Sequence, residues 1–161
     1  SVLYSEWLEE LSNENPNLDN LNTILNQLLE DYKNTGYTKL ALLSKANMDA
    51  KSNAFNQALE NFNILIDLTN GFGGNKIFNK MARVSAARIL LTQDRYEEAL
   101  KMVDTYSSSG TNGYIHELTG DILVKQNKNN LAITQYELAA AKYSDETSKS
   151  IISMKIANIG T

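Results

Sequence analysis

The sequence has no cysteine, and only one proline and one histidine among its 161 residues. Without cysteine it can form neither a disulfide nor a Cys–His catalytic pair, and one histidine cannot build a multi-histidine metal site. No apolar run approaches the roughly 18 residues of a membrane-spanning helix. The net charge is −4 and the basic residues are scattered, which argues against a nucleic-acid partner. These absences predict a chain that is not an enzyme and needs no cofactor or metal.

Three features invite a catalytic or ligand-binding interpretation, and each has a plainer one. His116 is interpreted as a packing residue at a contact between repeats. Residues 71–76, GFGGNK, lack the spacing and the Ser/Thr of a phosphate-binding loop and are interpreted as a flexible linker. The adjacent glutamates at 9–10 and 97–98 point about 100° apart on a helix, so we interpret them as solvated faces rather than acid–base pairs.

Apolar residues recur at helical spacing along the whole chain and no segment alternates as a strand does, which predicts an all-α fold. Pro16 interrupts the pattern after the first helix, and Gly36 is expected to cap the C-terminal end of the second. Short connections make adjacent helices antiparallel. We expect about nine helices. Six are expected at residues 1–11, 18–29, 37–51, 54–68, 76–92 and 96–106. Two more lie before and after a turn at residues 125–130, and the last spans residues 145–158.

A register of small residues repeats through the chain. Gly120 is expected where a first helix crosses a neighbour closely, as are Ala46 and Ala87. Each is followed twelve residues later by an alanine of the second helix, and four further on by a larger residue. The alanines are Ala58, Ala99 and Ala132, and the larger residues are Phe62, Val103 and Tyr136.

The interval from Ala99 to Ala132 is 33 residues, near the period of about 34 in tetratricopeptide repeats. The interval from Ala58 to Ala99 is 41, because the glycine-rich linker lies inside it. We therefore predict a single helical-repeat domain, a tetratricopeptide-repeat-like α-solenoid, over residues 1–161. It comprises a degenerate N-terminal pair at 1–34, repeat-like pairs at 35–69, 76–106 and 112–142, and a capping helix at 145–159.

Stacked helix pairs expose a concave face lined by their first helices. The register places on this concave face side chains that are apolar at the centre, with a few charged residues among them. Such a surface suits an extended or helical apolar segment of a protein partner. For the apolar members, the alternative is ordinary core packing between first and second helices. The predicted partner-binding residues are Leu43, Asn47, Val84, Arg88, Leu91, Tyr114, Glu117, Asp121 and Val124.

The last helix is rich in isoleucine. We interpret it as a cap over the exposed face of the final repeat. The alternative is a helix that inserts into the groove of a second copy and makes a homodimer. Its apolar residues are Ile151, Ile152, Met154, Ile156 and Ile159.

The order of features over nearly the whole chain resembles the periplasmic part of the YfgM-like proteins, ancillary subunits of the bacterial Sec translocon. The segments that carry the resemblance are residues 37–46 (YTKLALLSKA), residues 82–99 with RVSAARILL and YEEAL, residues 116–123 (HELTGDIL) and residues 154–159 (MKIANI). The resemblance implies one N-terminal transmembrane helix and a periplasmic helical-repeat domain. It also implies association with the translocon and with a membrane-anchored periplasmic chaperone of the prolyl-isomerase type.

Two classes of function follow. The resemblance implies a non-catalytic interaction module on the periplasmic side of the inner membrane, which assists exported chains and is held by an anchor upstream of Ser1. The residues alone also allow a cytosolic tetratricopeptide-repeat scaffold, or the regulatory domain of a larger protein. An apolar run of about 20 residues upstream of Ser1 would favour the first class.

Overall fold

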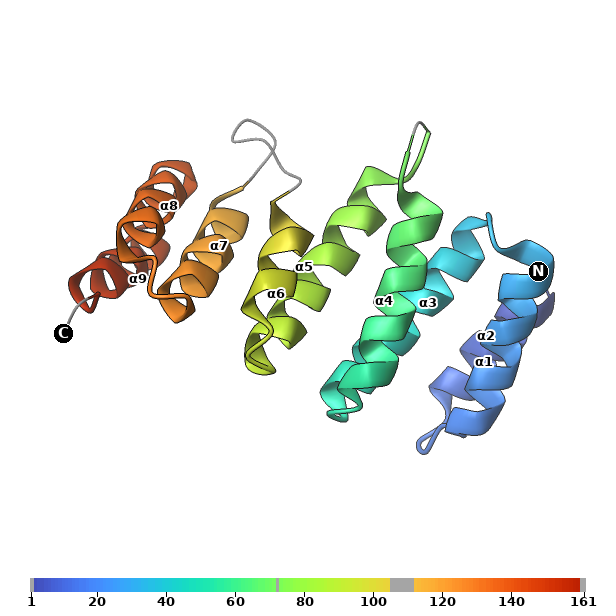
Figure 1. Cartoon of the computed structure of the whole chain (residues 1–161). Coiled ribbons are helices and arrows are strands. Elements are labelled where there is room, and N and C mark those ends of the chain that lie inside the picture. Colours follow the sequence, from blue (N-terminus) through green and yellow to red (C-terminus); the bar gives the residue numbers. More distant parts are fainter. Residues whose placement is uncertain (1, 72, 105–111, 160–161) are drawn as a thin grey trace. The chain divides into compact units, whose positions relative to one another are not determined.

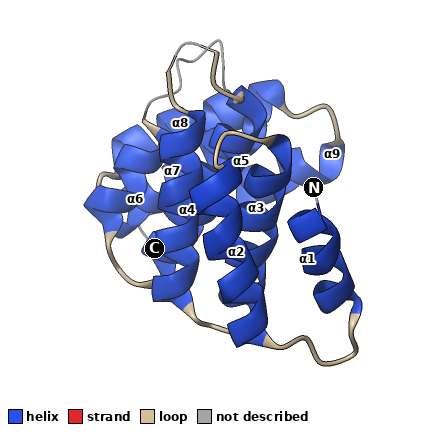
Figure 2. Ribbon diagram, turned by 90° about the vertical axis from the view of Figure 1, so that its right-hand side faces the viewer, coloured by secondary structure: helices blue, strands red, loops and turns tan. Residues whose placement is uncertain are grey.

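Nine α-helices and no β-strand are present in the residues that the structure, a computed structural model, describes: 2–71, 73–104 and 112–159 (Figures 1 and 2). The all-α expectation is confirmed. The expected extension of the sixth helix to residue 106 lies outside the described residues. The helices are α1 (Val2–Ser12), α2 (Leu18–Tyr32), α3 (Gly36–Lys51), α4 (Phe55–Thr69), α5 (Lys76–Thr92), α6 (Tyr96–Val103), α7 (Gly113–Lys125), α8 (Asn129–Lys142) and α9 (Glu146–Ala157).

The helices fall into two units, Ser1–Ala86 and Ala87–Thr161, with the boundary inside α5. In the first unit, α1 packs against α2 and α3, α2 also against α3, and α3 against α4. In the second unit, α7 packs against α6 and α8, and α8 against α9. Within α1–α4 and within α6–α9, helices that follow each other in the chain thus pack against each other, while a single domain over residues 1–161 stays a prediction.

Three helix–helix turns share one backbone conformation. Asn53, Asp94 and Asn127 have φ angles of 60°, 59° and 58°, in the left-handed region that asparagine and aspartate tolerate best. In each turn the following N–H donates to a carbonyl five residues back, at 2.8–2.9 Å, and closes the preceding helix. The turns are 41 and 33 residues apart, the same intervals as the alanine register, so the repeat extends to the backbone.

One local expectation is wrong. Gly36 does not cap α2, which ends at Tyr32, but is the first residue of α3. Thr35 is the N-cap of α3 and accepts a hydrogen bond from the backbone N–H of Thr38 at 3.3 Å. The Thr38 hydroxyl in turn donates to the carbonyl of Tyr32 at 2.7 Å. Two threonines therefore join the helices here, and no left-handed glycine is needed.

The small-residue register is confirmed as core. Ala46, Ala87, Ala58, Ala99 and Ala132 are fully buried, and so is Gly120. A Cβ at Gly120 would lie 2.5 Å from Cε1 of Tyr136, so the α7–α8 crossing requires glycine. Ile152 of α9 is buried against a cluster that includes Leu123 and Tyr136, as a capping helix would be. Within the described residues, no helix is long and apolar enough to span a membrane.

Candidate functional site

The candidate site of the second unit is built on α7. The side chain of Asn112 begins this helix by accepting a hydrogen bond from the N–H of Ile115 at 3.0 Å. Gly113 follows directly under the ring of Tyr143, where a Cβ would lie 3.0 Å from the ring carbons. This close approach brings the Tyr143 hydroxyl to Glu117, one helical turn further along α7.

Five polar side chains from α7, α8 with its C-cap residue Tyr143, and α9 form a continuous network. Lys155 lies between the two carboxylates of α7, with its Nζ 2.7 Å from Oε1 of Glu117 and 2.7 and 2.8 Å from the oxygens of Asp121. The hydroxyl of Tyr143 donates to Glu117 at 2.6 Å, and that of Tyr136 donates to Asp121 at 2.7 Å. The ammonium also lies 5.8 Å from the centroid of the Tyr136 ring. We call this set the Lys155 network.

The charges of the network stabilise each other. Burial by itself would lower the pKa of Lys155, but hydrogen bonds to Asp121 and Glu117 outweigh it and the pKa is raised. Burial would likewise raise the pKa of Glu117, yet hydrogen bonds from Lys155 and Tyr143 lower it. Both groups are therefore held in their charged forms.

The two tyrosines are held in their neutral forms. Burial, followed by the hydrogen bond to Asp121, raises the pKa of Tyr136 well above its ordinary value of 10.0. Burial and the hydrogen bond to Glu117 raise the pKa of Tyr143 in the same way. A general acid or base works best with a pKa near the operating pH. The shifts of Glu117, Lys155 and both tyrosines all lead away from neutrality, which favours a structural connection between three helices over acid–base chemistry.

The other predicted groove residues of the second unit differ in accessibility. Arg88 is exposed, Tyr114 is 37% exposed, and Leu91 is half-buried. Val124 is also half-buried and packs against the core cluster around Leu123 and Tyr136, as its core alternative supposed. Because Glu117 and Asp121 already bind Lys155, Arg88 and Tyr114 are the predicted residues of the second unit that are best placed to meet a partner.

The remaining predicted groove residues lie in the first unit. Leu43 is only 9% exposed and belongs to the core, which is the alternative stated for it. Asn47 on α3 is exposed and Val84 on α5 is half-buried. The nine predicted residues are thus divided between the two units, and the structure places each group only within its own unit.

A comparison with protein families identifies the fold. A family model described as a tetratricopeptide repeat-like domain matches residues 1–161. The chain belongs to the tetratricopeptide repeat-like domain family. A comparison with curated proteins gives no match. Family membership makes the chain an all-α solenoid and a protein–protein interaction module, the general role of such helical-repeat folds.

The candidate catalytic features of this tetratricopeptide-repeat-like chain have structural partners. His116 is buried, and its Nδ1 lies 2.8 Å from Oε1 of Gln135 on α8. This hydrogen bond joins the two helices of one pair, and the expected packing of His116 at a contact between repeats stays a prediction. In the linker, Gly71 and Gly73 have φ angles of 89° and 86°. Asn75 then caps α5 by accepting from the N–H groups of Ile77 and Phe78, so the linker works as a helix start.

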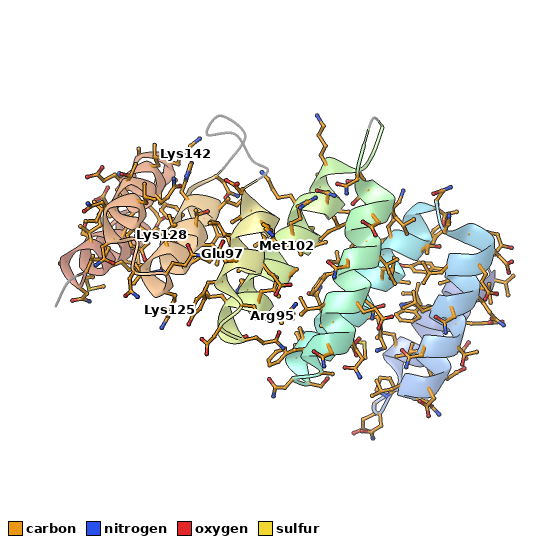
Figure 3. The ribbon with its side chains drawn as sticks, viewed as in Figure 1. Arg95, Glu97, Met102, Lys125, Lys128 and Lys142 are labelled. Atoms are coloured by element: carbon orange, nitrogen blue, oxygen red, sulfur yellow. The ribbon has the colours of Figure 1, made fainter. Side chains whose placement is uncertain are left out.

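The adjacent glutamates are also engaged separately. Glu98 accepts two hydrogen bonds from Arg95, at 2.8 and 2.7 Å, while Glu97 accepts from Gln126 at 2.7 Å. Lys128, the residue before α8, lies 3.9 Å from Glu97 on α6, and Figure 3 labels Arg95, Glu97 and Lys128 in the second unit. Among the described residues, no group of three or more His, Cys, Asp or Glu side chains is arranged to hold a metal ion.

Sequence reasoning missed Lys155 and Tyr143 as members of the site. A signal for Lys155 was present, because Ile152, Lys155, Ile156 and Ile159 share one face of α9 at helical spacing. A lysine on the apolar face of a capping helix predicts a carboxylate partner beneath it. Tyr143 carried no such signal, since its contact with Glu117 depends on the α7–α8 crossing.

Proposed function

We propose that this chain is a protein-interaction module of the bacterial cell envelope that associates with the Sec translocon and a membrane-anchored periplasmic chaperone, and so assists exported proteins. The observation that carries the proposal is the match of the whole chain to a tetratricopeptide repeat-like family. The envelope location is supported by the resemblance of residues 37–46 and 116–123 to the YfgM-like proteins. An anchor upstream of Ser1 and a periplasmic position belong to the same proposal.

Within the second unit, we place partner contact around Arg88 and Tyr114. Arginine and tyrosine dominate the binding energy of many interfaces, and both side chains are accessible before binding. Tyr114 precedes Glu117 by one turn on α7, the helix to which Lys155 connects α9. A preorganised surface loses less conformational entropy on binding.

The test is recovery of partners from a bacterial membrane extract by the immobilised chain. Arg88→Ala and Tyr114→Ala should each weaken binding by about 2 kcal/mol, roughly thirtyfold. Quantitative mass spectrometry should show loss of translocon subunits and of the chaperone together. Tyr32→Ala on α2, another exposed tyrosine, is the matched control and should leave recovery unchanged.

Circular dichroism should confirm that both variants remain folded. Unchanged recovery with folded variants would remove the surface around Arg88 and Tyr114 from the proposal. Failure of the native chain itself to recover translocon or chaperone would contradict the envelope function. Accessibility of the full-length protein to protease in spheroplasts tests its location separately.

A further inference from the structure

A buried ion pair lies in the first unit, where α3 packs against α4. Nζ of Lys45 is 2.6 Å from Oδ1 of Asp49, one turn further along α3, and the two side chains are only 4% and 7% exposed. The second carboxylate oxygen of Asp49 accepts a hydrogen bond from Nδ2 of Asn61, on α4, at 3.2 Å. We call Lys45, Asp49 and Asn61 the α3–α4 triad. It places two charges inside a helix pair and joins them to an amide of the second helix.

The fold does not require charges at these two positions of α3. They lie directly before and three residues after Ala46, the register residue of this helix. At the same places relative to their own register residues, α5 and α7 carry side chains without charge, and most of these are buried. They are Ala86 and Leu90 in α5, and Thr119 and Leu123 in α7.

The α4 member of the triad also occupies a repeated position. Asn61 of α4, Met102 of α6 and Gln135 of α8 each follow the register alanine of their helix by three residues. The Asn61 amide binds Asp49 of α3, and the Gln135 amide binds His116 of α7. Met102, labelled in Figure 3, has no hydrogen-bond donor and only a weak acceptor. Helices that share one small-residue register thus differ in the polar group at this position.

Burial of the triad adds little to stability. Moving two charges out of water costs about as much as their mutual attraction returns, so apolar residues of similar size often give an equally stable or more stable protein. The geometry of buried polar groups is nevertheless strict, because a buried carboxylate oxygen without a donor is costly. Asp49 therefore favours the one packing of α3 in which an amide of the facing helix reaches its second oxygen.

From this combination we propose that the α3–α4 triad is a pairing device, which selects α4 as the partner of α3 and fixes the register of the two helices. The second helices α4, α6 and α8 share one alanine register, and repeat proteins are prone to misassembly between similar elements. In the same register against α6, the second oxygen of Asp49 would meet Met102 and lack a donor. Against α8 it would meet Gln135, whose amide is already bound to His116. A shift of α4 by one turn would move Asn61 away from Asp49 and have the same effect.

Burial argues against a ligand-binding or catalytic role for the same groups. Both charged side chains are covered, so a ligand could reach them only if the helices separated. Each carboxylate oxygen of Asp49 already accepts a hydrogen bond. The triad lies in the first unit, so the proposal does not depend on the surface around Arg88 and Tyr114.

The main test replaces the triad by apolar residues of similar size, in the triple variant Lys45→Met, Asp49→Leu and Asn61→Leu. Its urea midpoint should equal or exceed that of the native chain. Spin labels at two exposed positions, Asn47→Cys on α3 and Asn63→Cys on α4, report the pairing after refolding, since the chain has no cysteine of its own. The native chain should give one distance between the labels, and the triple variant more than one. A single native distance in the triple variant would overturn the proposal, whatever its midpoint.

A second test moves the amide, leaves the ion pair in place and remains informative if the triple variant fails to fold. Asn61→Leu with Met102→Asn transfers the amide from α4 to the same register position of α6, and should give a larger non-native population than Asn61→Leu alone. Asn61→Leu with Glu137→Asn puts the amide at an exposed position of α8 and is the matched control, which should behave as Asn61→Leu alone does. Equal non-native populations in the two double variants would overturn the proposal.

The remaining variants test the burial of the charges. Lys45→Met leaves the Asp49 carboxylate inside the pair without its cation, and should unfold at a lower urea concentration than the triple variant. Lys51→Ala with Glu60→Ala removes one charge of each sign from exposed positions of the same two helices, and should leave the midpoint and the label distance unchanged. A Lys45→Met variant as stable as the triple variant would overturn the proposal, because the buried carboxylate would then need no partner.

Discussion

At the scale of single residues, Gly120 is the position where one methyl group decides the packing. In Gly120→Ala the new Cβ would lie 2.5 Å from the Tyr136 ring. That ring cannot move away without breaking its 2.7 Å hydrogen bond to Asp121. We expect a loss of unfolding free energy on the order of 1–3 kcal/mol in urea titrations.

Gly36→Ala is the control for this prediction. A Cβ at Gly36 has no neighbouring atom within 4 Å, so the substitution should be neutral or stabilise by roughly 0.4–1 kcal/mol. Equal destabilisation by both variants would mean that α7 and α8 do not cross at Gly120.

Asn127 is a second position where one residue type is required, here by the backbone. Its φ of 58° lies in the left-handed region, which costs most residues on the order of 1 kcal/mol. Asn127→Ala should lower the unfolding free energy by about that amount, and Asn127→Gly should not. Asn130→Ala, an exposed asparagine inside α8, serves as the control. A harmless Asn127→Ala would show that this turn does not set the α7–α8 geometry.

At the scale of elements, α9 is attached by an apolar contact through Ile152 and by Lys155. Lys155→Met keeps an unbranched side chain that is only one atom shorter, but it leaves Glu117 and Asp121 without their cation. We expect about 1–2 kcal/mol of lost stability, less than for a fully buried pair, because Lys155 and Asp121 are 30% and 32% exposed and water screens them. Hydrogen exchange should show earlier opening of α9 than of α7.

The matched control lies on the same helix. Lys149 pairs with Glu146 at 3.0 Å, but the Glu146 side chain is 87% exposed. Lys149→Met should therefore change stability by less than about 0.5 kcal/mol. If Lys149→Met and Lys155→Met behave alike, the network contributes no more than an ordinary surface ion pair.

The same network predicts a pH dependence with two limbs. The pKa of Glu117 is lowered in the folded chain, so its contribution is present above its ordinary pKa of 4.5 and is lost as pH falls. The pKa values of Lys155, Tyr136 and Tyr143 are raised, so their contributions are present below about pH 10 and are lost as pH rises. The unfolding free energy should therefore fall as the pH drops below about 4.5 and as it rises above about 10.

Lys155→Met tests the part of the pH dependence that lies at low pH and depends on Glu117. Without the ammonium, burial acts on Glu117 against the hydrogen bond from Tyr143 alone, so its pKa should rise. The difference between native and variant stability should then shrink as pH falls below about 4.5. A difference independent of pH would indicate that Lys155 acts only through packing.

At the scale of the whole molecule, the fold could be predicted from the sequence because it depends on short-range patterns. Ala58, Ala99 and Ala132 repeat at set intervals, and each helix carries its own apolar face. Helix starts were less readable: Gly36 was assigned to the end of α2, although Thr35, the residue before it, is the N-cap of α3 through a local hydrogen bond from the N–H of Thr38.

The candidate site was readable only in part, since it depends on contacts distant in sequence. Glu117 and Asp121 were correctly noticed as charges on a first helix, but Lys155 is 34 residues away from Asp121. No local pattern says which carboxylate a distant lysine will reach. Leu43 and Val124 show the same limit, because a shift of one helical position separates a groove residue from a core residue.

The oligomeric state follows from how α9 is already used. Ile152 is buried within its own chain and Lys155 is bound by two carboxylates of α7, so inserting α9 into a second copy would first break these contacts. The apolar residues that stay exposed on α9, Ile151 and Met154, are too few for the roughly 1,200 Å² of a stable interface. We therefore predict that the chain is a monomer in sedimentation experiments at micromolar concentration.

Two substitutions on α9 test this prediction. Ile151→Ser with Met154→Ser should change neither the sedimentation coefficient nor the unfolding free energy, because both side chains face solvent. Ile152→Ala should cost about 2–5 kcal/mol, because its side chain is buried in the cluster around Tyr136. A concentration-dependent dimer that the double variant dissociates would instead establish α9 as a homodimer interface. In that case its exposed face, rather than the cap beneath it, would be the functional surface of the last helix.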